Sequence, residues 1–340
     1  MEVLMMSRLG VLTRWVCIVM MAMFFAGCAL SYKVKEPVVS SISYTRKDIA
    51  PATLTVIDKR TGSDAIFLAK VIGIGGSMSD SVTLKIDNME DPVGYFTYQL
   101  GRELVSRGIP VKCVVGKTAD EGLVLLIHKY QIVNIRATGF SPWEACHLFY
   151  GTILAGGLEK PIKAYFYNGK TPVWSMEEIE EPCFTIPVSI MIKEVASKIN
   201  RAVFNLRAPD EEIDALTAQI NAETGKDEKD PYARPFWEVL ELGYSNNPKA
   251  MEPLKKYAGD SDEFFKACAL SAIGTLGADG QLEFLLQHYR AGAYNDKYMA
   301  AKSIGDMGTP EALQILKDMK KDKAYTNEGG LRYCVDLYVP

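Results

Sequence analysis

Three segments in the last third of the chain superpose at an offset of 31 residues, and this repeat constrains the fold more than any other sequence feature. The matching positions are Leu242-Gly243, Ile273-Gly274 and Ile304-Gly305; Met251, Leu282 and Leu313; Leu254, Leu285 and Leu316; and Asn246, Gly277 and Gly308. Glycine and asparagine tolerate the left-handed conformation that ends a helix, while Pro248, Asp279 and Pro310 are residue types that open one. Each unit is therefore predicted to be a helix pair whose inner glycine lets neighbouring helices approach closely.

This pattern resembles the short, lyase-type HEAT repeats, although its period is below the ~40 residues of long HEAT units. Helix pairs of this kind stack because one pair alone cannot bury its apolar face. We expect residues 231–340 to form an all-α HEAT-like solenoid, with Leu331 to Tyr338 as a partial fourth unit or a cap. The resemblance implies a concave protein-binding surface; the alternative is that the helices only extend or dimerise the module before them.

The N-terminus has the features of a secretory signal. Arg8 and Arg14 precede an apolar run, Trp15 to Phe25, that is shorter than the ~20 residues needed to span a bilayer. Phe25-Ala26-Gly27-Cys28 resembles the lipobox of bacterial lipoproteins, with Phe25 where leucine is usual. The resemblance implies cleavage before Cys28, its acylation with fatty acids such as palmitate, and, because Ala29 follows instead of aspartate, the outer membrane. An ordinary signal peptide with an incidental cysteine is the alternative.

Composition and spacing divide the rest of the chain. With 340 residues, 48% of them apolar and 24% charged, the sequence is that of a folded protein of about two domains. The net charge of −4 gives no reason to expect a nucleic-acid partner. The predicted segments are a signal peptide (1–27), an acylated tether (28–51), an α+β module (52–207), a charged linker with a short helix (208–230) and the helical repeats (231–340).

The α+β module is predicted from alternating and helical patterns. Short β-rich runs are followed by a helix over 93–105, and a second helix occupies 187–206. Asn168-Gly169 is typical of a type I′ turn and predicts a hairpin of 163–167 with 171–175. Two helices on one face of a mostly antiparallel sheet is the simplest arrangement.

This layout resembles small lipoproteins of the YajG kind and periplasmic modules with a TolB-N-terminal-like fold. The stretches TVIDKR and DPVGYFTYQLGRELVSRGIPV carry the resemblance. Since those relatives are mostly assembly factors or proteins of unassigned role, it implies a non-enzymatic, partner-binding module.

The sequence predicts no catalytic, cofactor or metal site. Gly73 to Ser77 lacks the lysine and the helix of a phosphate-binding loop, and no CxxC pair occurs. The acids from Glu177 to Glu181 are expected on an extended strand, where neighbours point to opposite faces of a solvated edge. His128 and His147 have no spaced partner and are interpreted as structural.

Two further features allow more than one interpretation. Cys146 and Cys183 could form a disulfide if their strands are neighbours; otherwise the cysteines are buried small hydrophobes. Trp143 and Trp174 could line a peptide or lipid groove, although core or hairpin packing is favoured.

These patterns together favour a lipid-anchored adaptor or envelope-assembly lipoprotein on the periplasmic face of the outer membrane, with an unidentified protein partner. A lipid or lipopolysaccharide chaperone is the first alternative and would need an apolar cavity between sheet and helices. A hydrolase is the second, and would need His128 or His147 beside an acid in a pocket.

Overall fold

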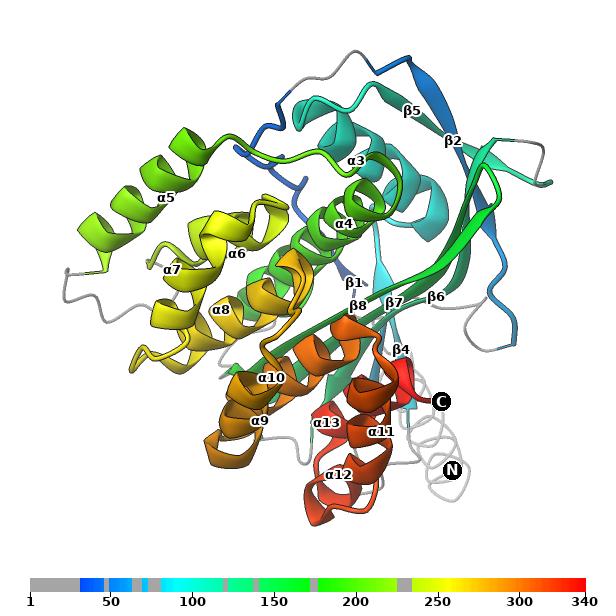
Figure 1. The fold of residues 1–340 in the computed structure, drawn as a ribbon. Coiled ribbons are helices and arrows are strands. Elements are labelled where there is room, and N and C mark those ends of the chain that lie inside the picture. The colour runs from blue at the N-terminus through cyan, green and yellow to red at the C-terminus, as the bar shows by residue number, and fades with distance from the viewer. Residues whose placement is uncertain are drawn as a thin grey trace, which may run out of the picture.

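The computed structural model describes residues 31–45, 49–62, 69–72, 81–118, 122–136, 141–171, 177–224 and 234–340. The signal peptide, Cys28, the 73–77 loop, Trp174 and residues 225–230 of the linker lie outside the described residues. Within them, an α+β region is followed by an all-helical region, so the predicted fold class is confirmed (Figure 1).

One mixed sheet forms the centre of the molecule. Among the described residues it has eight strands, with the order β1-β4-β3-β6-β2-β5 and with β7 and β8 following on the other side of β6. The long strands β6, β7 and β8 pair antiparallel, whereas the short strands β2 and β3 pair parallel with successive halves of β6. The strands are β1 (Ser31–Tyr32), β2 (Ala52–Asp58), β3 (Ala69–Ile72), β4 (Ser81–Ile86), β5 (Val111–Gly116), β6 (Leu123–Ile135), β7 (Trp143–Ala155) and β8 (Leu158–Thr171).

The prediction of a hairpin turn at Asn168-Gly169 is wrong. The chain turns instead at Gly156-Gly157, where φ angles of 54° and 84° suit two glycines, and β8 continues through Thr171. The Asn168 side chain donates to the backbone oxygen of Pro182 at 2.8 Å. A Cβ atom at Gly169 would lie 2.5 Å from the Tyr167 ring, so the glycine is needed for packing within a strand rather than for a turn.

Two helices cover one face of the sheet, as predicted. These are α3 (Pro92–Ser106), which packs on β5, and α4 (Ile186–Ile199), which packs on β8. All residues of α4 are buried, because further helices cover its outer side (Figure 1). Residues 177–185 form short helical turns before α4 and are not the extended strand that was predicted.

The C-terminal helices form the predicted stack of pairs. The first helices of the pairs lie in one row with the terminal helix, and the second helices lie outside them. The bounds are α5 (Asp210–Glu223), α6 (Phe236–Tyr244), α7 (Met251–Tyr257), α8 (Glu263–Leu276), α9 (Leu282–Ala291), α10 (Tyr294–Met307), α11 (Pro310–Met319), α12 (Lys323–Asn327) and α13 (Gly329–Tyr338).

The repeated glycines have the predicted role. A Cβ atom would lie 2.7 Å from Ala272 at Gly243, 2.5 Å from Ser303 at Gly274 and 2.4 Å from Tyr338 at Gly305. The turn residues Asn246, Gly277 and Gly308 all have positive φ, of 51°, 112° and 65°. Asp279 is the exception among the expected helix starts, since α9 begins only at Leu282.

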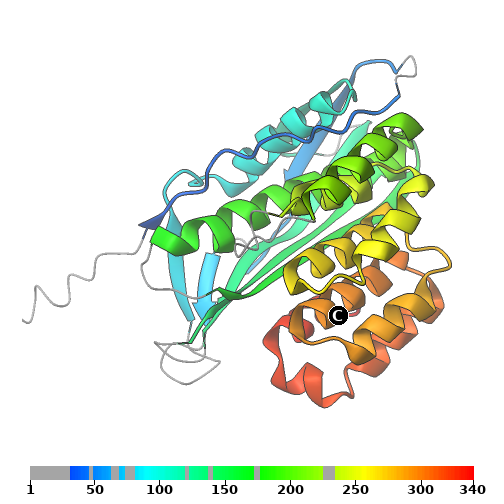
Figure 2. The ribbon, with the colours of Figure 1, turned by 90° about the vertical axis from the view of Figure 1, so that its left-hand side faces the viewer.

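The row of first helices packs against the protein's own α+β region. In this row α8 contacts α4, α10 contacts β8, and α13 contacts both β7 and β8 (Figure 2). The Tyr165 hydroxyl donates to the backbone oxygen of Gly330 at 2.8 Å, and the rings of Tyr167 and Tyr298 meet edge to face. One apolar core therefore runs through both regions, and this row of helices is not free to bind a partner.

The segment that was predicted to be a tether is bound to the protein surface over residues 31–45, which we call the strap. Every second side chain over much of the strap is buried, namely those of Tyr32, Val34, Ser40, Ile42 and Tyr44. The alternation of inward and outward side chains explains why a segment without helical periodicity is ordered.

No described helix is long and apolar enough to cross a membrane.

Candidate binding site

The strap is fixed by acids from helices far away in the sequence. The backbone amides of Lys33 and Ser40 donate to carboxylates of Glu180 and Glu103 at 2.9 and 3.1 Å. The backbone amide and the hydroxyl of Ser41 both donate to Glu241, which belongs to α6 of the helical region. The acids predicted to form a solvated strand edge thus include Glu180, which holds the strap.

A buried arginine completes this attachment. Arg107 has no solvent exposure, and it donates to Glu103 at 2.7 Å, to the Ser40 hydroxyl at 3.1 Å and to the Tyr44 hydroxyl at 3.2 Å. The Tyr44 hydroxyl donates in turn to the backbone oxygen of Tyr244 in α6 at 2.8 Å. The strap therefore contacts both the α+β region and the helical region.

The structure does not bring the predicted histidines and cysteines into one site. Nε2 of His147 lies 3.0 Å from the backbone oxygen of Cys183, and burial lowers the pKa of His147 to about 3. His128 is paired with the Thr152 hydroxyl at 3.0 Å.

Cys146 and Cys183 are both buried free thiols, so the disulfide alternative is not supported. Trp143 is buried in the core, in agreement with the packing interpretation.

A cleft of about 470 Å³ lies where the sheet meets the helical region. Its walls come from β8, from the end of α4 and the turn after it, from the end of α10 and the start of α11, and from Tyr338 at the end of α13. Its lining mixes charged side chains, such as Lys160 and Lys198, with apolar ones, so it is not the apolar cavity that a lipid chaperone would need. Neither His128 nor His147 is among its lining residues.

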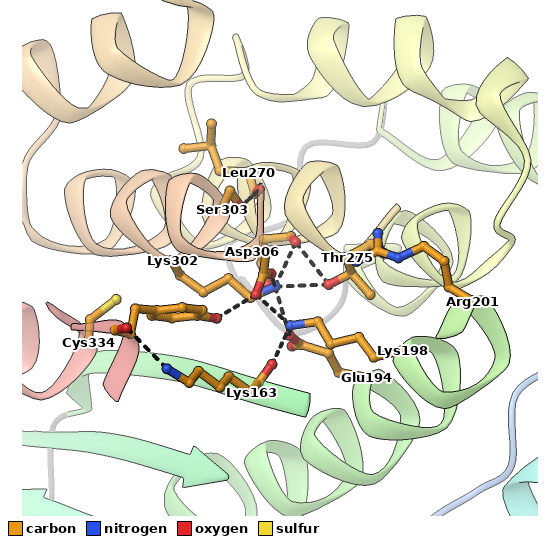
Figure 3. Close-up of polar contacts among 12 residues, drawn as sticks. Lys163, Glu194, Lys198, Arg201, Leu270, Thr275, Lys302, Ser303, Asp306 and Cys334 are labelled. Atoms are coloured by element: carbon orange, nitrogen blue, oxygen red, sulfur yellow. Dashed lines mark hydrogen bonds and ion pairs between the residues drawn. The ribbon is translucent and has the colours of Figure 1, made fainter. Parts of the chain in front are cut away.

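Four charged side chains form a buried network beneath this cleft (Figure 3). Lys198 of α4 donates to Glu194 and to Asp306, both at 2.6 Å. Lys302 of α10 lies 2.9 Å from each of the same two carboxylates. The network therefore balances two positive charges with two negative charges and links α4 to α10.

Further hydrogen bonds hold the network in place. Lys302 also donates to the Thr275 hydroxyl at 2.8 Å and to the backbone oxygen of Ser271 at 2.9 Å, and the Tyr338 hydroxyl donates to Asp306 at 2.5 Å. Burial opposes charge on both groups, but the two lysines hold the pKa of Asp306 below its usual value, and the acids raise that of Lys302. Both groups are consequently charged at neutral pH.

The rim of the cleft carries cations that the network does not neutralise. Lys160, Lys163 and Arg201 line it, and within the described residues no carboxylate lies at ion-pair distance from any of them. Lys163 donates to the backbone oxygen of Tyr338 at 3.0 Å, and burial lowers its pKa. Arg201 donates to the backbone oxygen of Thr275 at 2.9 Å. The cleft thus has a surplus of positive charge.

Sequence reasoning missed this cleft, although the repeat contains a signal for it. At the offset of 31 residues, Lys302 and Asp306 occupy the positions of Ser271 and Thr275 in the preceding unit. Two charges four residues apart on the inner side of a packed helix need partners, because an unpaired buried charge is strongly unfavourable. That departure from the repeat marks the place where α10 meets Glu194 and Lys198.

Comparisons with known proteins identify no family for this chain. No family model matches the sequence, and no curated protein matches it. An uncharacterized protein of known structure is similar over 51% of this chain and 98% of its own length, with 9% identity and a TM-score of 0.34. A Xanthomonas campestris protein of family DUF330 is similar over 48% of this chain and 93% of its own, with 11% identity and a TM-score of 0.30.

Proposed function

We propose that this protein is a lipid-anchored adaptor on the periplasmic face of the outer membrane, acylated on Cys28, that holds a protein partner close to the bilayer. The observation that carries the proposal is the strap. It begins at Ser31, three residues after Cys28, and three residues of extended chain span at most ~11 Å. The folded body would therefore remain next to its anchor.

This arrangement differs from a body on a long flexible linker. Because the strap is bonded to α3 and α6 as well as to the turn before α4, the anchor would fix the α+β region and the helical region together. A rigid body kept close to the membrane suits an adaptor, since its surface is already formed when a partner arrives. The charged cleft between the two regions supports a binding role over lipid carriage.

The test compares the wild-type protein with a Cys28→Ser variant expressed with its signal peptide. We expect Cys28→Ser to lose fatty-acid labelling and detergent partitioning, and to recover fewer envelope proteins after cross-linking and mass spectrometry. A Cys113→Ser variant is the matched control, because Cys113 is a free, half-buried thiol of the folded body. Unchanged membrane association of Cys28→Ser would disprove the proposal.

A further inference from the structure

The cleft continues into a second cavity along the turns of the helical repeats. This second cavity has a volume of about 540 Å³, and it shares Arg201, Asp306 and Met307 with the first. Its other lining residues include the repeat turn residues Asn246 and Gly277. We call the two cavities together the junction groove, which runs from the β8 edge past Arg201 to the turn after α6.

Positive charge is distributed along the junction groove. Lys160 and Lys163 line the first cavity, Arg201 lines both, and Arg207 lines the second. Like the other three, Arg207 has no carboxylate at ion-pair distance in the part of the chain that the structure describes. Asp279 is an acid in the second cavity, whereas the charge of Asp306 is already balanced by the buried lysines.

The cations are separated rather than directed at one point. Figure 3 shows Lys163 and Arg201 on opposite sides of the buried network. A single phosphate group could not reach both ends of such a groove, but a chain with several carboxylates could. The α9 helix also begins beside Gln281 in the second cavity without a side-chain cap, and Glu283 already places one acid in its first turn.

We propose that the junction groove binds an extended acidic peptide segment of the partner protein. This inference rests on the proposed adaptor function and specifies the chemistry of its partner. Carboxylates of the segment would pair with Lys160 and Lys163 at one end, with Arg201 in the middle and with Arg207 at the other end. Pro161, Met307 and Leu313 supply apolar contact between these charges.

The experiment measures fluorescence anisotropy of a fluorescein-labelled peptide of alternating glutamate and alanine, titrated with the full-length protein in a neutral detergent. We expect saturable binding that weakens with added salt, and much weaker binding of the same peptide with glutamine in place of glutamate. Lys160→Gln and Arg207→Gln remove exposed cations at the two ends, so neither should affect folding. Each should weaken binding about two- to fivefold, and the double variant more.

The matched control is Lys112→Gln, which removes one exposed lysine on β5, at the opposite edge of the sheet. Equal binding of the glutamate and glutamine peptides, or an equal loss in Lys112→Gln, would overturn the inference. So would a Cys28→Ser protein that binds phosphatidylglycerol vesicles through Lys160 and Arg207 but does not bind the peptide. Since partner recovery in the Cys28→Ser comparison is a separate measurement, failure here leaves the adaptor proposal intact.

Discussion

At the scale of single residues, the charged side chains of the buried network specify how α4 and α10 pack together more than they raise the free energy of unfolding. A buried ion pair often contributes little net free energy, but removing one partner is unfavourable by about 3–5 kcal/mol. Lys302 has four polar partners, from α4, α8 and its own helix. These contacts specify one arrangement of α10 against α4, because another arrangement would leave a buried charge unpaired.

His147 predicts a pH dependence at the same scale. Burial lowers its pKa from 6.5 to about 3, so between these pH values the unfolded chain binds a proton that the folded protein does not. The free energy of unfolding should therefore decrease by up to ~1.4 kcal/mol for each pH unit below 6.5 from this group alone. Above pH 6.5 the residue is neutral in both states and has no such effect.

Urea unfolding at several pH values checks this prediction. His147→Gln has no titrating group and keeps a donor for the Cys183 oxygen, so its stability should fall less steeply with acid than that of the wild type. His128→Gln is the control, because His128 is less buried and its pKa is lowered to a smaller extent. Parallel pH profiles for the wild type and His147→Gln would contradict the argument.

At the scale of elements, close helix contacts in the repeat depend on one glycine in each unit. A Cβ atom at Gly274 would lie 2.5 Å from the Ser303 hydroxyl and 2.7 Å from its Cα atom. The hydroxyl could rotate away, but the Cα atom moves only if α10 shifts as a whole. The spacing between α8 and α10 is thus set by the absence of a side chain at this position.

We expect Gly274→Ala to lower the free energy of unfolding by about 1–3 kcal/mol, because overpacking a helix contact outweighs the ~1 kcal/mol gained in helix propensity. The measurement is the urea midpoint at constant slope. Gly101→Ala in α3 serves as the control, since its nearest contact would be Cys113 at 3.3 Å. Stabilisation of both variants alike would show that α8 and α10 are not in tight contact.

At the scale of the whole molecule, we expect the two regions to unfold as one unit. The strap, the shared apolar core and the network from α4 to α10 all cross between them. Deletion of residues 231–323 is therefore expected to destabilise the α+β region. Such a deletion would expose the buried face of α4 and leave Lys198 and Glu194 without the partners that α10 supplies.

A chain cut between the two regions tests whether they stay associated and unfold together. With a protease site inserted between Thr224 and Arg234, the two fragments should co-elute after cleavage on size-exclusion chromatography and unfold in a single urea transition. Their interface includes buried aromatic contacts such as Phe166 with Phe264, which association of the fragments would preserve. Separation of the fragments without denaturant would instead favour two independent domains joined by a linker.

Much of the local structure was determined by the sequence alone. The helix pairs, the positive-φ turns at Asn246, Gly277 and Gly308, and the close glycine contacts all followed from the repeat, because caps and helix periodicity depend on neighbouring residues. The order of an α+β region followed by helices was also predictable. The prediction of a tether over 28–51, in contrast, was wrong for residues 31–45. Polar residues in this segment conceal the alternation of the buried side chains of Tyr32, Val34, Ile42 and Tyr44.

Tertiary structure decided the features on which the proposed function rests. Asn168-Gly169 has strong turn chemistry, yet long pairing with β7 keeps it in a strand and places the turn at Gly156-Gly157. The strap, the buried network and the junction groove join residues about 100 to 200 positions apart, such as Ser41 with Glu241 and Lys198 with Asp306. Local propensity contains no information about such pairs, because their free energy arises only when the packed core brings the two segments together and excludes water from them.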